Sequence, residues 1–100
     1  MFILRQTEEF VAWLDGLRDI KAQARIAARL RQVESGTLGD GKAIEGAVSE
    51  FRVNYGPGYR IYFTRRGKVL IVLLSGGSKS TQKRDIRRAI EMEALIGSDL

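Results

Sequence analysis

Three basic residues carry the chemistry that this sequence offers most clearly. Arg52 and Arg60 stand on either side of the turn-rich run 54–58, and Lys79 follows a Gly-Gly-Ser run. If the flanking segments pair as antiparallel strands around that five-residue loop, Arg52 lies directly opposite Arg60. Like charges at such positions destabilise a sheet, so the pair would suit an external anion such as phosphate, which guanidinium groups bind with two hydrogen bonds. Lys79, just before a predicted helix, would add a third cation.

Glu50 shares a strand face with Arg52, because side chains two positions apart point to the same side of a strand. In the register described above it lies opposite Tyr62 and diagonally close to Arg60. Two interpretations are open. Either Glu50 neutralises the arginine pair and leaves an ordinary exposed face, or the two guanidinium groups wait for an external phosphate.

The sequence contains no cysteine and no histidine. Disulfides, thiolate chemistry and cysteine-ligated metals are therefore excluded, and the commonest general base and metal ligand is missing. Acid–base chemistry must use Glu, Asp, Lys, Arg or Tyr. The run 75–80 looks like a P-loop but lacks the first glycine at the required spacing. We expect no cofactor and no metal.

The chain has 100 residues, of which 44% are hydrophobic and 29% charged, as is typical of one small domain, here spanning residues 1–100. Lys and Arg number 17 against 12 Asp and Glu, and the net charge of +5 favours a polyanionic or acidic partner. The longest apolar run, 69–74, is far shorter than the roughly 20 residues of a membrane span. The N-terminus also lacks the pattern of a signal peptide. We therefore expect a cytoplasmic protein that contacts no membrane.

Hydrophobic spacing predicts the elements that must position these residues. A short strand over 2–4 precedes a helix capped by Thr7, with Phe10, Leu14 and Leu17 on its buried face. A second helix over 20–34 completes an antiparallel hairpin, and 37–46 is predicted as a glycine-rich loop. Alternation then predicts strands over 48–53 and 59–65, an apolar strand over 69–74 covered on both sides, a break at 75–78 and a last helix over 82–96. The order is β-α-α-β-β-β-α, and the fold class is α+β, with a mainly antiparallel sheet packed against the helical hairpin.

Two of the predicted helices carry rows of cations. The second helix presents Arg18, Lys21, Arg25 and Arg29 at helical spacing, and the last helix begins with Lys83, Arg84, Arg87 and Arg88. Such a row is typical of a solvated helix face, and it is also what a surface for RNA phosphates would need. The candidate RNA-binding residues are Arg25, Arg29, Lys83 and Arg84.

The three predicted strands and the start of the last helix carry a family likeness. Val-Ser-Glu-Phe-Arg-Val at 48–53, Gly-Tyr-Arg-Ile-Tyr-Phe at 58–63, the apolar strand and Gly-Gly-Ser-Lys-Ser-Thr-Gln at 76–82 occur in this order, followed by Asp85-Ile86 and Ala89. This arrangement resembles the RelE/ParE superfamily of bacterial toxins, in particular its HigB-like "addiction module killer" branch. The resemblance covers nearly the whole chain and implies the RelE-like microbial ribonuclease fold.

The resemblance also implies a function, that of the toxin in a type II toxin–antitoxin system. Ribosome-dependent toxins of this superfamily cut mRNA in the ribosomal A site by attack of a 2′-hydroxyl on the adjacent phosphate, without a metal. Their basic residues correspond to Arg52, Arg60 and Lys79, and fixed cations would stabilise the extra negative charge of the phosphorane. Some relatives use a histidine or a C-terminal tyrosine for proton transfer, and the last helix here has neither. Glu50 is then the candidate base, with Tyr59 or Tyr62 as an alternative acid.

Two other functions fit the same resemblance. A ParE-like gyrase inhibitor would act through protein contact, and a non-catalytic member would only bind its antitoxin and help to repress the operon. All three imply a cognate antitoxin, expected to be a helix-turn-helix protein of the HigA type, with operator DNA bound only through that antitoxin. The endonuclease alone implies mRNA on the ribosome as a partner.

Overall fold

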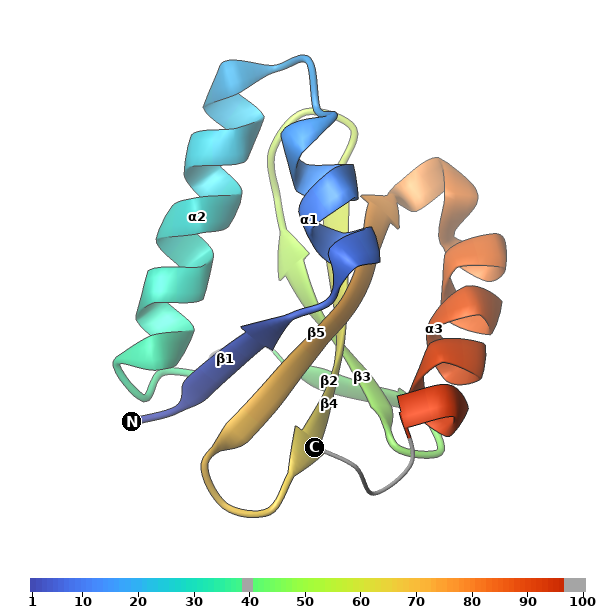
Figure 1. Cartoon of the computed structure of the whole chain (residues 1–100). Coiled ribbons are helices and arrows are strands. Elements are labelled where there is room, and N and C mark those ends of the chain that lie inside the picture. Colours follow the sequence, from blue (N-terminus) through green and yellow to red (C-terminus); the bar gives the residue numbers. More distant parts are fainter. Residues whose placement is uncertain (39–40, 97–100) are drawn as a thin grey trace.

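The computed structural model describes residues 1–38 and 41–96, which form a five-stranded sheet with helices on both faces (Figure 1). The strand order is β1-β5-β4-β3-β2, with β1 parallel to β5 and the other neighbours antiparallel. In chain order the elements are β1 (Ile3–Gln6), α1 (Glu8–Asp15), α2 (Ile20–Glu34), β2 (Lys42–Glu45), β3 (Val48–Val53), β4 (Tyr59–Arg66), β5 (Leu70–Ser78), a 3₁₀ turn (Lys79–Thr81) and α3 (Gln82–Ile96). The α+β class and the mainly antiparallel sheet are confirmed.

Side-chain caps fix where the first two helices begin. The Thr7 hydroxyl accepts a hydrogen bond from the backbone N–H of Phe10 at 3.0 Å, which confirms the predicted cap of α1. The Asp19 carboxylate accepts from the N–H groups of Lys21 and Ala22 and so caps α2. Helix α2 runs over the predicted residues 20–34 and ends at Ser35.

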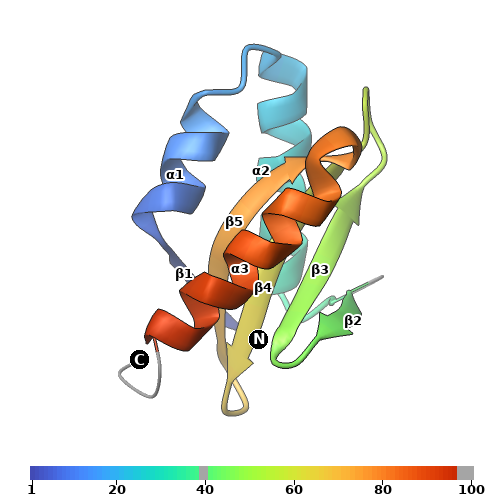
Figure 2. The ribbon, with the colours of Figure 1, turned by 90° about the vertical axis from the view of Figure 1, so that its right-hand side faces the viewer.

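Two apolar clusters pack on opposite faces of the sheet. Helices α1 and α2 cover one face, where the core includes Phe10, Ile26, Phe51, Ile61 and Leu73. Helix α3 covers the other face, as Figure 2 shows, over Val48, Tyr62, Val72, Leu74 and Met92. Strand β5 contributes to both clusters because alternate side chains point to opposite faces, which confirms that the apolar strand is covered on both sides.

The prediction of a loop over 37–46 is wrong in its second half. Lys42–Glu45 forms the edge strand β2, which pairs with β3 through Lys42–Glu50 and Ala43–Ser49. This strand is short and mostly exposed, so its sequence carries no apolar alternation that would predict it, and backbone pairing with β3 holds it. Residues 39 and 40 of the predicted loop lie outside the described residues.

The predicted break at 75–78 is also wrong, because β5 continues through Ser78. The two glycines there serve close packing. A Cβ atom on Gly76 would overlap the Trp13 ring of α1, and one on Gly77 would overlap the Asp85 carboxylate of α3. Glycine inside a strand often marks such a close approach. Both helices can therefore pack tightly on the end of β5, directly before Lys79.

Candidate functional site

A surface cleft of about 420 Å³ lies at the end of the sheet where β3 connects to β4. The loop, the adjoining strand ends and the start of the 3₁₀ turn line it, with Arg52, Asn54, Tyr55, Gly56, Pro57, Gly58, Tyr59, Arg60 and Lys79. The three basic residues predicted to form an anion site thus lie in one hollow, although they come from three separate segments. A phosphate is the ligand that such a group of cations suits.

The β3–β4 loop shapes the cleft through two glycines and one long-range hydrogen bond. Gly56 and Gly58 have φ angles of +56° and +81°, in the left-handed region that favours glycine. The backbone N–H of Lys79 donates to the carbonyl of Gly58 at 2.9 Å. This bond fixes the start of the 3₁₀ turn against the loop and so holds Lys79 beside the two arginines.

The register of β3 and β4 is the one that the sequence predicts. Arg52 pairs with Arg60, Glu50 with Tyr62 and Val53 with Tyr59, which leaves the five residues 54–58 as the loop. The two arginines differ in exposure, since the side chain of Arg52 is 42% exposed and that of Arg60 is 11% exposed. Arg52 is therefore the more accessible of the two to a ligand.

Glu50 lies beneath the arginines rather than on the cleft wall. Its side chain is 0% exposed, and it is not among the lining residues. The Nε of Arg52 donates to its Oε1 at 3.2 Å, and Nη1 of Arg60 donates to Oε1 at 3.3 Å and to Oε2 at 3.4 Å. These contacts favour the interpretation in which Glu50 neutralises the pair, but the face is not an ordinary exposed one, because α3 covers the sheet around Glu50 and Tyr62.

The two tyrosines considered as acids have different surroundings. Tyr59 lines the cleft, whereas Tyr62 is fully buried in the cluster under α3. Burial, reinforced by the charges of Asp85 and Glu50 and opposed by that of Arg60, raises the pKa of Tyr62 to about 12. Within the described residues, the Tyr62 hydroxyl has no hydrogen-bond partner. Tyr62 is therefore too far inside the core to reach a ligand in the cleft, and Tyr59 is the better candidate.

Tyr55 is a cleft residue that the sequence reasoning does not single out. The guanidinium of Arg25 lies over its ring at 5.1 Å from the centroid, a cation–π distance. Burial raises the pKa of Tyr55, and the nearby Asp19 raises it further through its charge and a hydrogen bond. Tyr55 thus joins the cleft to the first turns of α2. In the sequence, only its position in the turn between Arg52 and Arg60 could have indicated that Tyr55 belongs to the cleft. Tyrosines are common in turns, so this indication is weak.

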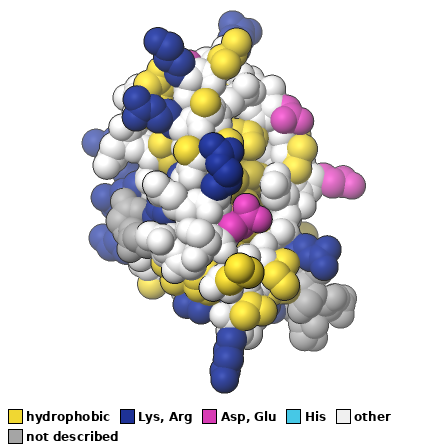
Figure 3. All heavy atoms as spheres, turned by 90° about the vertical axis from the view of Figure 1, so that its left-hand side faces the viewer, with side chains coloured by type: hydrophobic (Ala, Val, Ile, Leu, Met, Phe, Trp, Pro, Cys, Tyr) yellow, Lys and Arg dark blue, Asp and Glu magenta, His cyan; other side chains and the backbone are white. Residues whose placement is uncertain are grey.

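The predicted RNA-binding residues of α2 divide into two kinds. Arg25 is exposed and lies against the cleft residue Tyr55. Arg29 makes contacts within the fold instead. Its Nη2 donates to the carbonyl of Leu38 at 2.6 Å, and its guanidinium lies over the Phe51 ring at 4.9 Å from the centroid. Figure 3 shows the surface over α2, with dark blue Lys and Arg side chains spread across it.

The predicted RNA-binding residues of α3 lie next to the cleft. Lys83 and Arg84 line a second hollow of about 500 Å³ together with Lys79, which borders both hollows. The two cations are exposed. Their position at the start of a helix adds the positive end of the helix dipole to the local charge.

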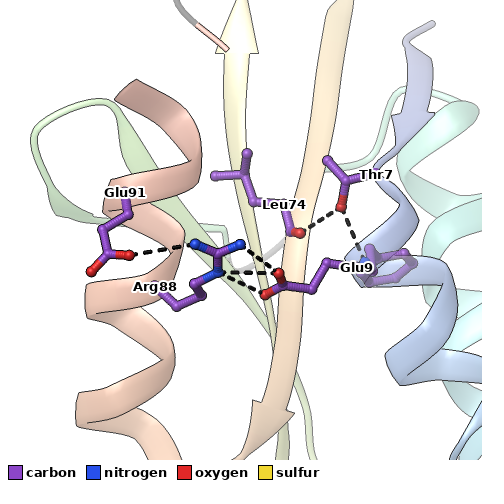
Figure 4. A network of polar contacts seen from close by, with 6 residues as sticks. Thr7, Glu9, Leu74, Arg88 and Glu91 are labelled. Atoms are coloured by element: carbon purple, nitrogen blue, oxygen red, sulfur yellow. Dashed lines mark hydrogen bonds and ion pairs between the residues drawn. The ribbon is translucent and has the colours of Figure 1, made fainter. Parts of the chain in front are cut away.

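A second cluster of arginine and carboxylates lies outside the set of cleft residues. Arg88 of α3 donates through Nη2 and Nε to Glu9 of α1 at 2.8 to 3.2 Å, and through Nη1 to Glu91 at 3.4 Å (Figure 4). The hydrogen bonds and charge of Glu9 raise the pKa of Arg88. This cluster joins helices that cover opposite faces of the sheet.

Comparison with known proteins identifies the family. Residues 12–92 match the family described as "Phage derived protein Gp49-like (DUF891)". The chain belongs to this Gp49-like family. It is 40% identical over 94 residues to a Haemophilus influenzae protein described as uncharacterized, and the match covers 94% of this chain and 95% of that relative.

The Gp49-like chain shares its fold with RelE. It superposes on a double arginine-to-alanine variant of the E. coli RelE toxin in the free state with a TM-score of 0.72 and 15% identity, over 90% of this chain and 95% of that one. The isolated E. coli RelE toxin gives a TM-score of 0.64 and 15% identity, over 88% and 98%. The expected RelE-like fold is confirmed, and the HigB-like branch stays a prediction.

The described residues of this Gp49-like chain hold neither a membrane-spanning helix nor a cluster of metal ligands. Within 1–38 and 41–96, no helix is long and apolar enough to cross a membrane. The same residues contain no group of three or more acidic side chains that could hold a metal ion.

Proposed function

We propose that this protein is the toxin of a type II toxin–antitoxin system in the RelE/ParE superfamily, and that it cuts mRNA on the ribosome. The observation that carries the proposal is the cleft, in which Arg52, Arg60 and Lys79 converge from three segments of a RelE-type fold. Three cations around one hollow are suited to a phosphodiester, and the net charge of +5 is suited to a polyanionic substrate.

The proposed reaction is a metal-independent transesterification. The 2′-oxygen of one nucleotide bonds to the adjacent phosphorus while its proton passes to a base, and the bond from phosphorus to the 5′-oxygen breaks. The 5′-oxygen takes up a proton, so the products are a 2′,3′-cyclic phosphate and a free 5′-hydroxyl. The phosphorane between these states carries more negative charge than the substrate, so fixed cations stabilise it selectively.

The three cations of the cleft and Tyr59 each have a part in this proposal. Arg52 and Lys79, both exposed, bind the phosphate oxygens, and Arg60 supports them from deeper in the wall. Tyr59 is our candidate for proton transfer to the leaving oxygen, since it lines the cleft and Tyr62 does not. Arg25, Lys83 and Arg84 bind neighbouring phosphates on either side of the cleft.

The proposed partners follow from the same placement within the superfamily. We assign the chain to the HigB-like branch, and the antitoxin to the helix-turn-helix HigA type, with operator DNA bound only through the antitoxin. A basic toxin is complementary in charge to an acidic antitoxin segment.

Mapping RNA 5′ ends after induction of the protein tests the function. We expect cuts within translated messages and growth arrest, both strongly reduced in Arg52→Ala and Lys79→Ala and both retained in Lys68→Ala, which removes an exposed cation from the β4–β5 turn. Intact messages with an SOS response would show a gyrase inhibitor instead. Full toxicity of both cleft variants would show that the cleft does not carry the activity.

A further inference from the structure

We propose that Glu50 is a positioning residue that holds Arg52 and Arg60 in place for the phosphate, and not the base of the reaction. The proposal deepens the proposed function and rests on it for its effect on cleavage. Its structural part, that one carboxylate orients both guanidinium groups, stands on contacts that are independent of any RNA.

The carboxylate of Glu50 lies between two like charges that the sheet forces together. Arg52 and Arg60 are direct cross-strand partners, an arrangement that repels without a counter-charge. Glu50 contacts both, through Nε of Arg52 and Nη1 of Arg60, at 3.2 to 3.4 Å. One negative charge against two positive charges leaves the group with an excess of one cation, so the cleft stays attractive to phosphate.

Glu50 leaves donors of Arg52 unused, and these are available for a ligand in the cleft. A guanidinium has five N–H donors, and Glu50 accepts from Nε of Arg52 and Nη1 of Arg60. The side chain of Arg52 is 42% exposed in the cleft wall, so its remaining donors are accessible. A buried carboxylate behind the guanidinium fixes its orientation before the phosphate arrives, which lowers the entropy lost on binding.

The placement of Glu50 argues against direct proton transfer. A base must come within hydrogen-bond distance of the 2′-hydroxyl, yet Glu50 is fully buried and does not line the cleft. Both arginines would have to leave the carboxylate before a hydroxyl could contact it. Its cross-strand neighbour on β4, Tyr62, does not open a path, since it is itself buried.

NMR of the free protein tests the positioning directly. In ¹⁵N-labelled protein the Nε–Hε resonance of Arg52 and the Nη1–Hη1 resonance of Arg60, the two groups that donate to Glu50, are assigned from their loss in Arg52→Ala and Arg60→Ala. We expect Glu50→Gln to move both resonances toward those of exposed arginines, while Glu45→Gln, which removes an exposed carboxylate from β2, leaves them unchanged. Unchanged resonances in Glu50→Gln would overturn the proposal.

A double-mutant cycle on RNA cleavage separates positioning from a direct chemical role. We expect Glu50→Gln to lower the cleavage rate about 100-fold in the wild-type background, because small displacements of a catalytic group cost that much. In an Arg52→Ala, Arg60→Ala background the same substitution should change the residual rate little, because the groups it positions are gone. The same factor in both backgrounds would show that Glu50 acts on the substrate itself.

The NMR and cleavage measurements distinguish a failure of the proposed function from a failure of the positioning role of Glu50. If wild-type protein cuts no RNA, the proposed function is wrong, and the NMR comparison still decides whether Glu50 orients the arginines. If Glu50→Gln does not fold, Glu50→Asp replaces it, since the carboxylate keeps its charge but is one methylene shorter. Glu50→Asp should shift the same two resonances and slow cleavage, and the absence of both changes would refute the positioning role.

Discussion

Two arginine–carboxylate clusters in this molecule use the same groups and have opposite properties. In the cleft cluster, Glu50 lies between Arg52 and Arg60; in the helix cluster, Arg88 lies between Glu9 and Glu91. The helix cluster has the shorter hydrogen bonds, down to 2.8 Å against 3.2 Å or more in the cleft. The carboxylates differ most in exposure, at 41% for Glu9 against 0% for Glu50; of the arginines, Arg88 at 44% resembles Arg52 at 42%, and only Arg60 at 11% is mostly buried.

Burial, and not hydrogen-bond length, should decide the consequence of breaking each cluster. An exposed ion pair exchanges its partner for water at little cost. A buried carboxylate that loses its partner cannot do so, and the cost is that of an unpaired buried charge. The cluster with the shorter hydrogen bonds should therefore contribute less to the stability of the fold.

Removal of Arg60 should have the largest effect on stability. Arg60→Ala leaves the buried Glu50 with Arg52 alone, and we expect a loss of about 3 kcal/mol in the free energy of unfolding, measured by urea denaturation. Arg52→Ala is the matched control, since Arg52 is 42% exposed and Glu50 keeps the contact of Arg60 with both of its oxygens. Equal losses in the two variants would mean that exposure does not separate them.

The burial of Tyr62, the cross-strand partner of Glu50, also predicts that the stability of the protein depends on pH. The pKa of its phenol is about 12 in the folded protein against an ordinary 10.0, first because of burial and then because of Asp85 and Glu50. A group whose pKa is raised on folding contributes stability that is present below the unfolded pKa and lost as the pH rises through the folded one. We expect a loss of roughly 2–3 kcal/mol between pH 10 and 12.

Tyr62→Phe isolates this effect. The phenylalanine keeps the ring in the cluster under α3 and removes the only titrating atom of the side chain. Urea denaturation at several alkaline pH values should give a flatter dependence for the variant than for the wild type. At neutral pH the variant should be at least as stable, because the Tyr62 hydroxyl finds no hydrogen-bond partner among the described residues. Identical pH dependence would show that another group is responsible.

Two glycines with similar backbone conformations, one inside the cleft and one outside it, test whether the shape of the cleft loop matters for activity. Gly58 and Gly67 both have positive φ angles, +81° and +71°, so an alanine at either position should cost about 1–2 kcal/mol. Only Gly58 belongs to the cleft, where its carbonyl accepts the hydrogen bond from Lys79. We expect Gly58→Ala to lower RNA cleavage about tenfold more than Gly67→Ala. Equal cleavage rates in the two variants would show that the conformation of the β3–β4 loop does not affect RNA cleavage.

The parts of the fold that local pattern determines are predictable from the sequence. The strict alternation in 48–53 and 59–65 fixes which side chains share a face, and that parity predicts the pairing of Arg52 with Arg60. The Ser35-Gly36 end of α2 and the Thr7 cap of α1 are equally local. Strand β2 is not predictable in this way, because backbone pairing and not its own side chains holds it in the sheet.

The parts that depend on a distant neighbour are not predictable. Gly76 and Gly77 suggest a break until Trp13 and Asp85 are found against them. The face that carries Glu50 and Arg52 looks solvated by its polarity, yet α3 covers part of that face and Glu50 is fully buried. For the same reason the sequence places the three cleft cations together but cannot tell that Glu50 lies behind them.

The smallest effect should come from the helix cluster. Arg88→Ala removes three ionic hydrogen bonds to Glu9 and one to Glu91, yet both exposed carboxylates then turn to water, so we expect no measurable change in the urea midpoint at physiological salt. Any change at low salt should vanish as added NaCl screens the exposed charges. Glu9→Gln is the reciprocal control and should behave alike. A loss in Arg88→Ala that matches Arg60→Ala and persists in high salt would mean that the link between α1 and α3, and not burial, determines which cluster matters.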